Sequence, residues 1–250
     1  MKKRILSRID IKNNYIIKGI HLEGLRKIGD PNLFARKYYN DGIDEIIFID
    51  SVASLYNRNT LSEIINQACK DIHVPITVGG GIRTLDDIER MFKNGADKVA
   101  INTQALKTPN ILSHAASYYG SQNIVVSMEV KRINADLWEP YYDNGREPSG
   151  IDLINWIRQV TDLGVGEIFL TSIDQDGTKK GFDIELAQKV SKITTVPIIV
   201  SGGAGNLEHI DDLFENQDIS GCALGSILHY KDFTIQDIKS YLSKKGHKIR

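Results

Sequence analysis

The chain has 250 residues, of which 31 are lysine or arginine and 32 are aspartate or glutamate, so its net charge near neutral pH is −1. Hydrophobic residues make up 41% and charged residues 25%, which is ordinary for a soluble globular protein and gives no electrostatic basis for binding nucleic acid or an anionic membrane. No apolar stretch approaches the roughly 18 residues that span a bilayer, and the start, MKKRILSRID, lacks the apolar core of a secretory signal, so we expect a cytoplasmic protein.

Short apolar runs alternate with longer amphipathic stretches along the chain. The runs are apolar on both faces, as in strands buried within a parallel sheet. Eight strands are expected, at 4–11, 45–50, 75–80, 98–102, 124–130, 167–173, 197–202 and 221–226. Helical periodicity lies between most of them, for example at 85–95, 150–164 and 185–193. This alternation predicts an α/β fold, a single (β/α)8 TIM barrel. A doubly wound open sheet would typically have fewer strands, and no G-x-G-x-x-G follows the first one.

The second half of the chain repeats the first. PITVGGGI at 75–82 returns as PIIVSGGA at 197–204, and GIDEIIFIDSVAS at 42–54 resembles GVGEIFLTSIDQDG at 164–177. The repeat is far longer than that of a solenoid protein. We therefore expect one domain, 1–250, built from two similar half-barrels at about 1–120 and 121–250. Each strand end then has a counterpart across the mouth of the barrel.

Glycine pairs follow the third and the seventh predicted strands, each before a helix. Glycine lets backbone N–H groups approach an anion closely, and a helix N-terminus adds partial positive charge. Barrels commonly bind phosphate with the loops after strands seven and eight. Plain tight turns are the alternative, but their symmetrical duplication favours a long substrate with a phosphate at each end. The predicted phosphate sites are Gly203 with Gly225 and Ser226, and Gly81 with Asn102 and Thr103.

Two carboxylates end the first and the fifth predicted strands, Asp10 and Glu129. Barrel enzymes work at the carboxyl ends of their strands, and a carboxylate pair across the mouth suits proton transfer, with one group as base and the other as acid. The alternative is that each acid caps backbone or holds the lysine two residues later, Lys12 or Lys131. The symmetrical placement of the two acids favours a functional role.

Four charged residues begin strands at the opposite end of the predicted barrel: Arg4, Glu45, Lys98 and Glu167. Residues at this end usually serve stability. The pattern alone therefore favours a structural, salt-bridged cluster.

The two cysteines, Cys69 and Cys222, have neither metal-type nor C-x-x-C spacing and are expected to be reduced core thiols. The six histidines are scattered, so no metal site is predicted.

Several longer motifs carry a family resemblance: VGGGIR, GADKVAINT, GSQNIVVS, LTSIDQDGT, DGTKKGFD and VSGGAGNLEH. Together they closely resemble the cyclase subunit of imidazole glycerol phosphate synthase, the HisF family of histidine biosynthesis, over about residues 4–244. The resemblance implies a carbon–nitrogen lyase that needs no cofactor and forms part of a glutamine amidotransferase complex. It would use ammonia to convert N′-phosphoribulosyl-formimino-AICAR phosphate to imidazole glycerol phosphate and AICAR.

The resemblance also assigns roles to residues of this chain. Asp10 and Glu129 would be the acid/base pair. Arg4, Glu45, Lys98 and Glu167 would form a gate for ammonia, which replaces the structural interpretation of that cluster. The ammonia would come from a HisH-like glutaminase docked on the N-terminal face, because neither cysteine lies in a nucleophile-elbow setting. The substrate and its phosphates would contact Lys18, Gly81, Asn102, Thr103, Asp176, Gly177, Gly203, Gly225 and Ser226.

Two departures from the family pattern keep other functions open. The second acid/base is ordinarily aspartate, whereas this chain has Glu129, and Lys27 stands where the family commonly has an acid. The chain resembles at these points a HisF-like branch that supplies ammonia for acetamidino-sugar synthesis on surface glycans. A third, non-enzymatic hypothesis is a catalytically silent barrel that only binds and activates the glutaminase.

Overall fold

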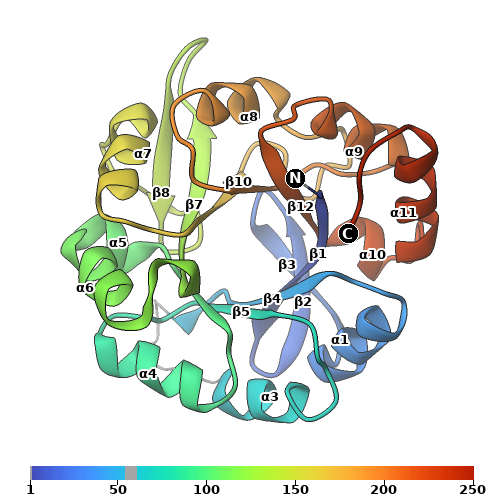
Figure 1. Cartoon of the computed structure of the whole chain (residues 1–250), viewed down its shortest axis with the longest axis horizontal. Helices are drawn as coiled ribbons and strands as arrows, with labels where there is room; N and C mark the ends of the chain where they lie inside the picture. The colour runs from blue at the N-terminus through green and yellow to red at the C-terminus, as the bar shows by residue number, and fades with distance from the viewer. Residues whose placement is uncertain (1, 54–60) are drawn as a thin grey trace.

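The computed structural model describes residues 2–53 and 61–250, and its centre is a closed barrel of eight parallel strands (Figure 1). Each strand pairs with the next, and the last closes on the first through pairs such as Arg4 with Gly221. All eight predicted strands are found close to their expected positions, so the barrel prediction is confirmed. The strands are β1 (Arg4–Lys12), β4 (Glu45–Asp50), β5 (Ile76–Gly79), β6 (Lys98–Ile101), β7 (Ile124–Arg132), β10 (Glu167–Ser172), β11 (Ile198–Ser201) and β12 (Ile219–Leu224).

Helices surround the barrel, and local sequence signals explain where several of them begin. Thr84 and Asp87 form a capping box at the start of α4, Thr234 and Asp237 do the same for α11, and Asp152 caps α7. The described helices are α1 (Pro31–Asn40), α3 (Leu61–Ala68), α4 (Leu85–Lys93), α5 (Thr103–Lys107), α6 (Asn110–Tyr119), α7 (Leu153–Asp162), α8 (Ile184–Ser191), α9 (Leu207–Phe214), α10 (Ser226–His229) and α11 (Ile235–Lys244), with a 3-10 turn at Ser121–Asn123. No helix among these is long and apolar enough to cross a membrane.

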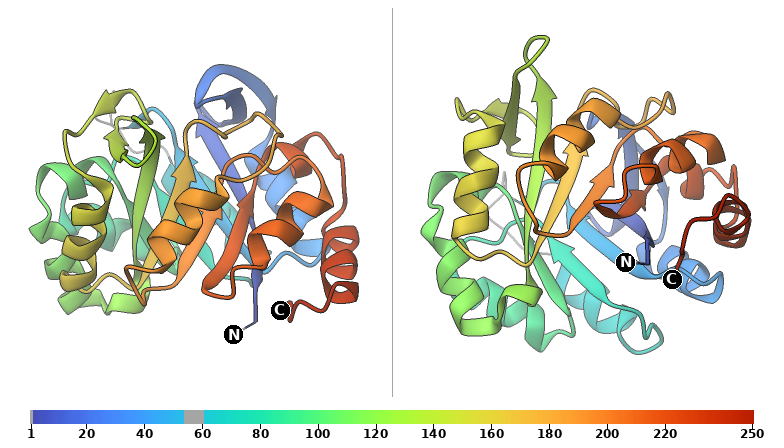
Figure 2. Two further views of the ribbon diagram at one scale, coloured as in Figure 1. Left: turned by 90° about the horizontal axis from the view of Figure 1, so that it is seen from above. Right: turned by 45° about the horizontal axis from the view of Figure 1, so that its top comes forward.

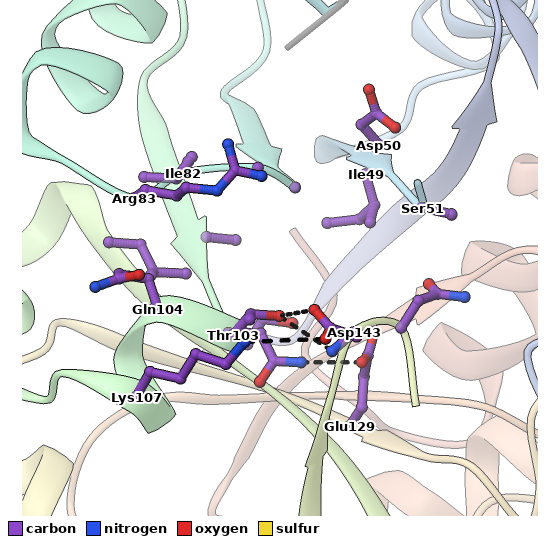
Figure 3. Close-up of a pocket in the computed structure, with 17 residues that line it drawn as sticks. Ile49, Asp50, Ser51, Ile82, Arg83, Thr103, Gln104, Lys107, Glu129 and Asp143 are labelled. Carbon is purple, nitrogen blue, oxygen red and sulfur yellow. Dashed lines mark hydrogen bonds and ion pairs between the residues drawn. The ribbon is translucent and has the colours of Figure 1, made fainter. Parts of the chain in front are cut away.

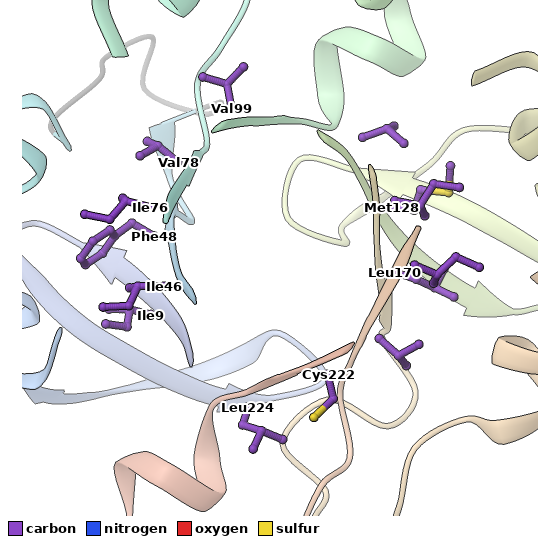
Figure 4. Packing of buried hydrophobic residues seen from close by; sticks show 14 of the residues in the cluster. Ile9, Ile46, Phe48, Ile76, Val78, Val99, Met128, Leu170, Cys222 and Leu224 are labelled. Atoms are coloured by element: carbon purple, nitrogen blue, oxygen red, sulfur yellow. The ribbon is translucent and has the colours of Figure 1, made fainter. Parts of the chain in front are cut away.

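The hydrophobic core has two layers because strand side chains alternate between the two faces of the barrel wall. Outward-facing residues such as Phe48, Val78 and Leu170 pack against the helices (Figure 4). A smaller inner cluster, which includes Leu6 and Phe169, fills the barrel interior. Polar side chains of the same inward register lie above and below this inner cluster.

Two antiparallel hairpins extend the barrel wall and rise from the same end of it (Figure 2). The first hairpin is β2 (Tyr15–Ile20) with β3 (Glu23–Gly29), and the second is β8 (Trp138–Tyr142) with β9 (Glu147–Pro148). The first pairs with β1 and the second with β7, the two strands that carry Asp10 and Glu129. The sequence pattern did not predict these hairpins, although Asn13 and Asn14, both with positive φ, form the tight turn into the first one.

The two ends of the described chain lie side by side at the other end of the barrel (Figure 2). Lys3 forms a parallel bridge with Ile249, and the Arg250 N–H donates to the Lys3 carbonyl at 3.0 Å. Arg4, the next residue, begins β1.

Candidate active site

One cavity at the mouth lies at the carboxyl ends of β4, β5 and β6 and has a volume of about 190 Å³ (Figure 3). Its wall includes Gly81, Asn102 and Thr103, the three residues predicted for one phosphate site, together with Glu129. We call the loops after β5 and β6 that carry Gly80, Gly81, Asn102 and Thr103 the N-terminal cradle. Asn102 donates through Nδ2 to Glu129 Oε2 at 2.9 Å, so this cradle is tied directly to one of the two predicted carboxylates.

A second cavity lies at the carboxyl ends of β10, β11 and β12, and its volume is only about 20 Å³. We call its lining loops, which carry Gly177, Gly203, Gly225 and Ser226, the C-terminal cradle. Gly203 has a φ of 106°, and a Cβ atom there would lie 1.9 Å from the Gly181 carbonyl oxygen, so the turn requires glycine. The space left in this cradle is close to that of a single water molecule.

Lys18 from β2 reaches into the C-terminal cradle and pairs with Asp176. The Lys18 Nζ lies 2.8 Å from each Asp176 carboxylate oxygen and 3.7 Å from Asp10 Oδ2. The His21 N–H donates to the Asp176 carbonyl at 2.8 Å, and Gly177 packs so closely on Gly19 that a Cβ would lie 2.2 Å from its carbonyl oxygen. The first hairpin is therefore packed against the loop after β10 and covers this cradle.

Asp10 lies beside Arg8, a residue that the sequence pattern did not single out. Arg8 donates through Nε to Asp10 Oδ1 at 2.8 Å and through Nη1 to Thr171 Oγ1 at 2.9 Å. Burial alone would raise the pKa of Asp10, but the charges of Arg8 and Lys18 outweigh it and hold that pKa below its ordinary value. Asp10 is therefore ionised at neutral pH.

Glu129 stands in the opposite electrostatic situation. Burial raises the pKa of Glu129 to about 7; the charge of Arg8 opposes this shift, and the charge of Asp10 adds to it. Near neutral pH Asp10 is thus ionised, while Glu129 is about half protonated. Such a separation of two carboxyl groups by their surroundings is what general acid–base catalysis uses.

The four charged residues at the N-terminal end of the barrel form a closed ring of ion pairs. Arg4 donates to Glu45 at 3.0 Å and pairs with Glu167, while Lys98 donates to the same two glutamates, at 2.9 Å in each case. Thr77 donates a further hydrogen bond to Glu45 at 2.8 Å. The glutamates are buried and the two cations are mostly buried, so the ring closes the bottom of the barrel interior.

Sequence reasoning missed other polar residues near the mouth. Arg83 and Lys107 line the cavity of the N-terminal cradle. Asp143 from the second hairpin accepts a long hydrogen bond of 3.4 Å from Thr103 Oγ1. The sequence could have indicated Arg83, because it stands two residues after Gly81 in VGGGIR, next to a predicted phosphate-binding loop. For Arg8, the period-two alternation of β1 could have placed it on the inner face with Asp10.

Other features singled out by the sequence lie outside the site. Lys27 is exposed on β3, with its Nζ 3.0 Å from the centroid of the Tyr15 ring. Both cysteines are free, and burial raises the pKa of both thiols.

One group of ligand-type side chains within the described ranges lies close together: Asp211, Glu215 and His247. His247 Nε2 lies 2.7 Å from Asp211 Oδ1, and Lys245 Nζ lies 3.2 Å from Asp211 Oδ2. A bound cation would have to compete with Lys245, so this group is better explained as an ion-pair network between α9 and the C-terminal segment.

A closed (β/α)8 barrel with a polar, carboxylate-bearing pocket at the carboxyl ends of its strands has the architecture of the barrel enzymes. The sequence profile of the family described as "Histidine biosynthesis protein" matches residues 4–234, so the chain belongs to this family.

Individual curated proteins within this family are similar to the chain over most or all of its length. It is 52% identical over 208 residues, 83% of this chain and 98% of the relative, to imidazole glycerol phosphate synthase subunit HisF of Legionella pneumophila. It is 41% identical over 250 residues, the full length of both chains, to the protein of the same name from Streptococcus mutans serotype c. The HisF protein of a Hydrogenobaculum species is 42% identical over 250 residues, all of this chain and 99% of that protein.

Proposed function

We propose that this chain is the cyclase subunit of imidazole glycerol phosphate synthase and acts as a carbon–nitrogen lyase in histidine biosynthesis. It would use ammonia to convert N′-phosphoribulosyl-formimino-AICAR phosphate to imidazole glycerol phosphate and AICAR. The observation that carries this proposal is an ionised Asp10 and a Glu129 that is about half protonated at neutral pH, between two glycine-rich cradles. Such a mouth can remove and deliver protons while both ends of a bisphosphate are held.

The two carboxyl groups take different roles in this reaction. Asp10, which is ionised, acts as the base. Glu129, with a pKa of about 7, acts as the acid and is held by the side chain of Asn102. A positioned acid or base contributes about 10²- to 10⁴-fold to a rate.

Each cradle takes one phosphate of the substrate. In the N-terminal cradle, the glycine backbone and the side chains of Asn102 and Thr103 face an open cavity. In the C-terminal cradle, Lys18 supplies a buried positive charge beside Gly225, where a Cβ atom would lie 3.6 Å from Lys18 Cε. Asp176 holds Lys18 within this cradle, and Gly177, Gly203 and Ser226 complete its wall.

Ammonia enters from the other end, through the ring of Arg4, Glu45, Lys98 and Glu167. A HisH-like glutaminase docked on this N-terminal face supplies it. Two observations support an external source. The curated relatives are named as subunits. The thiols of Cys69 and Cys222 have raised pKa values, the opposite of what an activated nucleophile needs.

The first test is to assay the purified chain, without a partner, with the bisphosphate and an ammonium salt at mildly alkaline pH, where free ammonia is available and part of Glu129 still carries its proton. We expect formation of both products. No turnover under these conditions would contradict the proposal and would favour the silent, glutaminase-activating barrel.

Lys98→Ala tests the ammonia route. The change opens the ring and leaves two buried glutamates with one fewer cation, so coupling between glutamine hydrolysis and product formation should fall while turnover with added ammonium salt persists. The measurement is the ratio of glutamate to product in the complex with the glutaminase. Equal losses with glutamine and with ammonium would mean that the ring is only structural.

Glu129 favours a second candidate, the ammonia-supplying subunit for acetamidino-sugar synthesis. An additional methylene moves a carboxyl group by about 1 Å, which is enough to weaken a preorganised site. If the chain is the histidine-pathway enzyme, Glu129→Asp should lower turnover of the bisphosphate. Background turnover by the wild type, together with a gain in Glu129→Asp, would favour the second candidate.

A further inference from the structure

Arg8 is a buried cation at the centre of the molecule whose role is not explained by the fold. Its side chain is 2% exposed, and its guanidinium carbon lies 5.5 Å from the centroid of the Phe169 ring. Burying a charge is costly unless it is paired. Arg8 is paired, because it donates to Asp10 and to Thr171, and this pairing ties it to the predicted base.

Arg8 also belongs to the wall of the C-terminal cradle. It lines the same small cavity as Lys18, Gly203 and Gly225. Both cations of this cradle are already engaged with carboxylates, Arg8 with Asp10 and Lys18 mainly with Asp176. The cradle is narrow, so an oxyanion that enters it lies against these two cations and competes with the carboxylates for them.

We propose that Arg8 couples occupation of the C-terminal cradle to the basicity of Asp10. A phosphoryl-type oxyanion that enters the cradle draws Arg8 and Lys18 toward itself and away from the carboxylates. Asp10 then has weaker cationic partners and a dianion nearby, so its affinity for a proton rises. The coupling rests on the proposed function in one respect, namely that this oxyanion is one end of the bisphosphate.

The surroundings of Asp10 support this direction. Burial alone would raise the pKa of Asp10, and Arg8 and Lys18, with a smaller contribution from His229, hold it low. The other titratable groups that face it are Glu129 and His229, with pKa values of about 7 and about 4, and Asp176 lies on the far side of Lys18. When the two cations turn to the anion, the effect of burial dominates. Arg8 is therefore a positioning residue that makes Asp10 a stronger base only when the cradle is filled.

Sulfate is a suitable probe because it resembles a phosphoryl group and keeps both charges across the useful pH range. We would titrate the full-length chain with sulfate at about pH 5, near the ordinary range of an aspartate, by calorimetry in two buffers of different ionisation enthalpy. The proposal fixes the direction of proton transfer on sulfate binding. Asp10 starts with a lowered pKa that rises on binding, so the protein takes up protons, and sulfate affinity increases as pH falls through that window.

The matched variant is Asp10→Asn, since Asp176 and His229 can also take up protons. We expect wild-type uptake to exceed that of Asp10→Asn by about half a proton or more per sulfate. Arg8→Met should weaken sulfate binding about 10-fold or more, and Arg8→Lys should recover part of the affinity. Thermal unfolding of each variant checks that it is folded.

Equal proton uptake by the wild type and Asp10→Asn would overturn the proposal. Unchanged sulfate affinity and uptake in both folded Arg8 variants would overturn it as well. The sulfate experiment needs no turnover, so its failure is distinct from failure of the proposed function. If proton uptake accompanies sulfate binding in a chain that does not turn over the bisphosphate, the Arg8 coupling stands and the proposed substrate is wrong.

Discussion

The N-terminal cradle encloses about 190 Å³, whereas the C-terminal cradle, built from the equivalent glycine loop of the repeat, encloses about 20 Å³. The N-terminal cradle presents Asn102 and Thr103 to a cavity that the less buried cations Arg83 and Lys107 also line. The C-terminal cradle contains two buried cations, Arg8 and Lys18, each held by a carboxylate. Glycine loops of similar sequence thus frame both cavities, while residues outside the repeated motifs decide their charge.

The two hairpins account for much of this difference. The first hairpin inserts Lys18 and packs on the loop after β10 through the His21 N–H and Gly19. The second hairpin contributes Asp143, which bonds Thr103 at the edge of the N-terminal cavity without filling it. The hairpins that follow β1 and β7 therefore differ in role: the first inserts a lysine into the C-terminal cradle, and the second only lines the edge of the N-terminal cavity.

The largest effect is expected from Asp10→Asn, which removes the proposed base next to the C-terminal cradle. The substitution keeps the shape of the side chain, so the barrel should fold, and KM should not rise because Arg8 and Lys18 lose a carboxylate that competes with the anionic substrate. Turnover with ammonium should fall about 10²- to 10⁴-fold, the usual contribution of a general base. The measurement is kcat from steady-state kinetics with KM as the control. A kcat near that of the wild type would mean that the C-terminal cradle holds no essential base.

Glu129 belongs to the N-terminal cradle, and its raised pKa predicts a pH-dependent cost to stability. Folding raises this pKa from 4.5 to about 7, so the folded state binds the proton more tightly. The contribution of this group to the unfolding free energy is therefore fully present below pH 4.5 and is lost as the pH rises through about 7. The total loss is about 3 kcal/mol, at 1.36 kcal/mol per pKa unit.

Glu129→Gln removes this titration. Relative to the wild type, the variant should gain about 3 kcal/mol in unfolding free energy between about pH 4 and pH 8, as measured by urea denaturation. Asp10→Asn is the matched control and should show a nearly constant difference from the wild type over this range, because folding lowers the pKa of Asp10 from its ordinary 3.8 and its titration lies below this window. If the difference in unfolding free energy between Glu129→Gln and the wild type stays constant over this range, the raised pKa of Glu129 is contradicted.

The smallest effects compare one lysine from each cradle. Lys18→Met removes a 4% exposed cation and should raise KM for the bisphosphate about 10-fold, in line with one lost charge-assisted hydrogen bond. Lys107→Met removes a cation that is 52% exposed and should raise KM less than about threefold. Steady-state kinetics at two salt concentrations measures both. Equal effects of the two substitutions would remove the functional distinction between the cradles.

The sequence predicted the barrel well because its strands are apolar on both faces and are separated by amphipathic helices. It also predicted which backbone segments meet at the mouth, since the carboxyl ends of parallel strands share one edge. It did not predict what fills the cradles. Lys18 and Asp176 lie 158 positions apart, and nothing in either local stretch indicates their pairing.

The protonation states were also beyond the sequence. The pKa of Glu129 depends on burial and on two neighbouring charges from β1, which strand patterning does not reveal. The alternation of β1 puts Arg8 on the same face as Asp10, but it does not show that this charged side chain is buried and paired. Only the closed barrel places it inside, next to Asp10.

The bridge between Lys3 and Ile249 has a practical consequence for protein engineering. Both ends emerge beside Arg4, so a purification tag or fluorescent protein fused at either terminus would occupy the surface where we propose the glutaminase to dock. The exposed turn between β7 and β8, at 133–136, lies at the opposite end and offers a safer insertion point. Circular permutation that joins the adjacent termini and opens the chain at this turn would free the docking face.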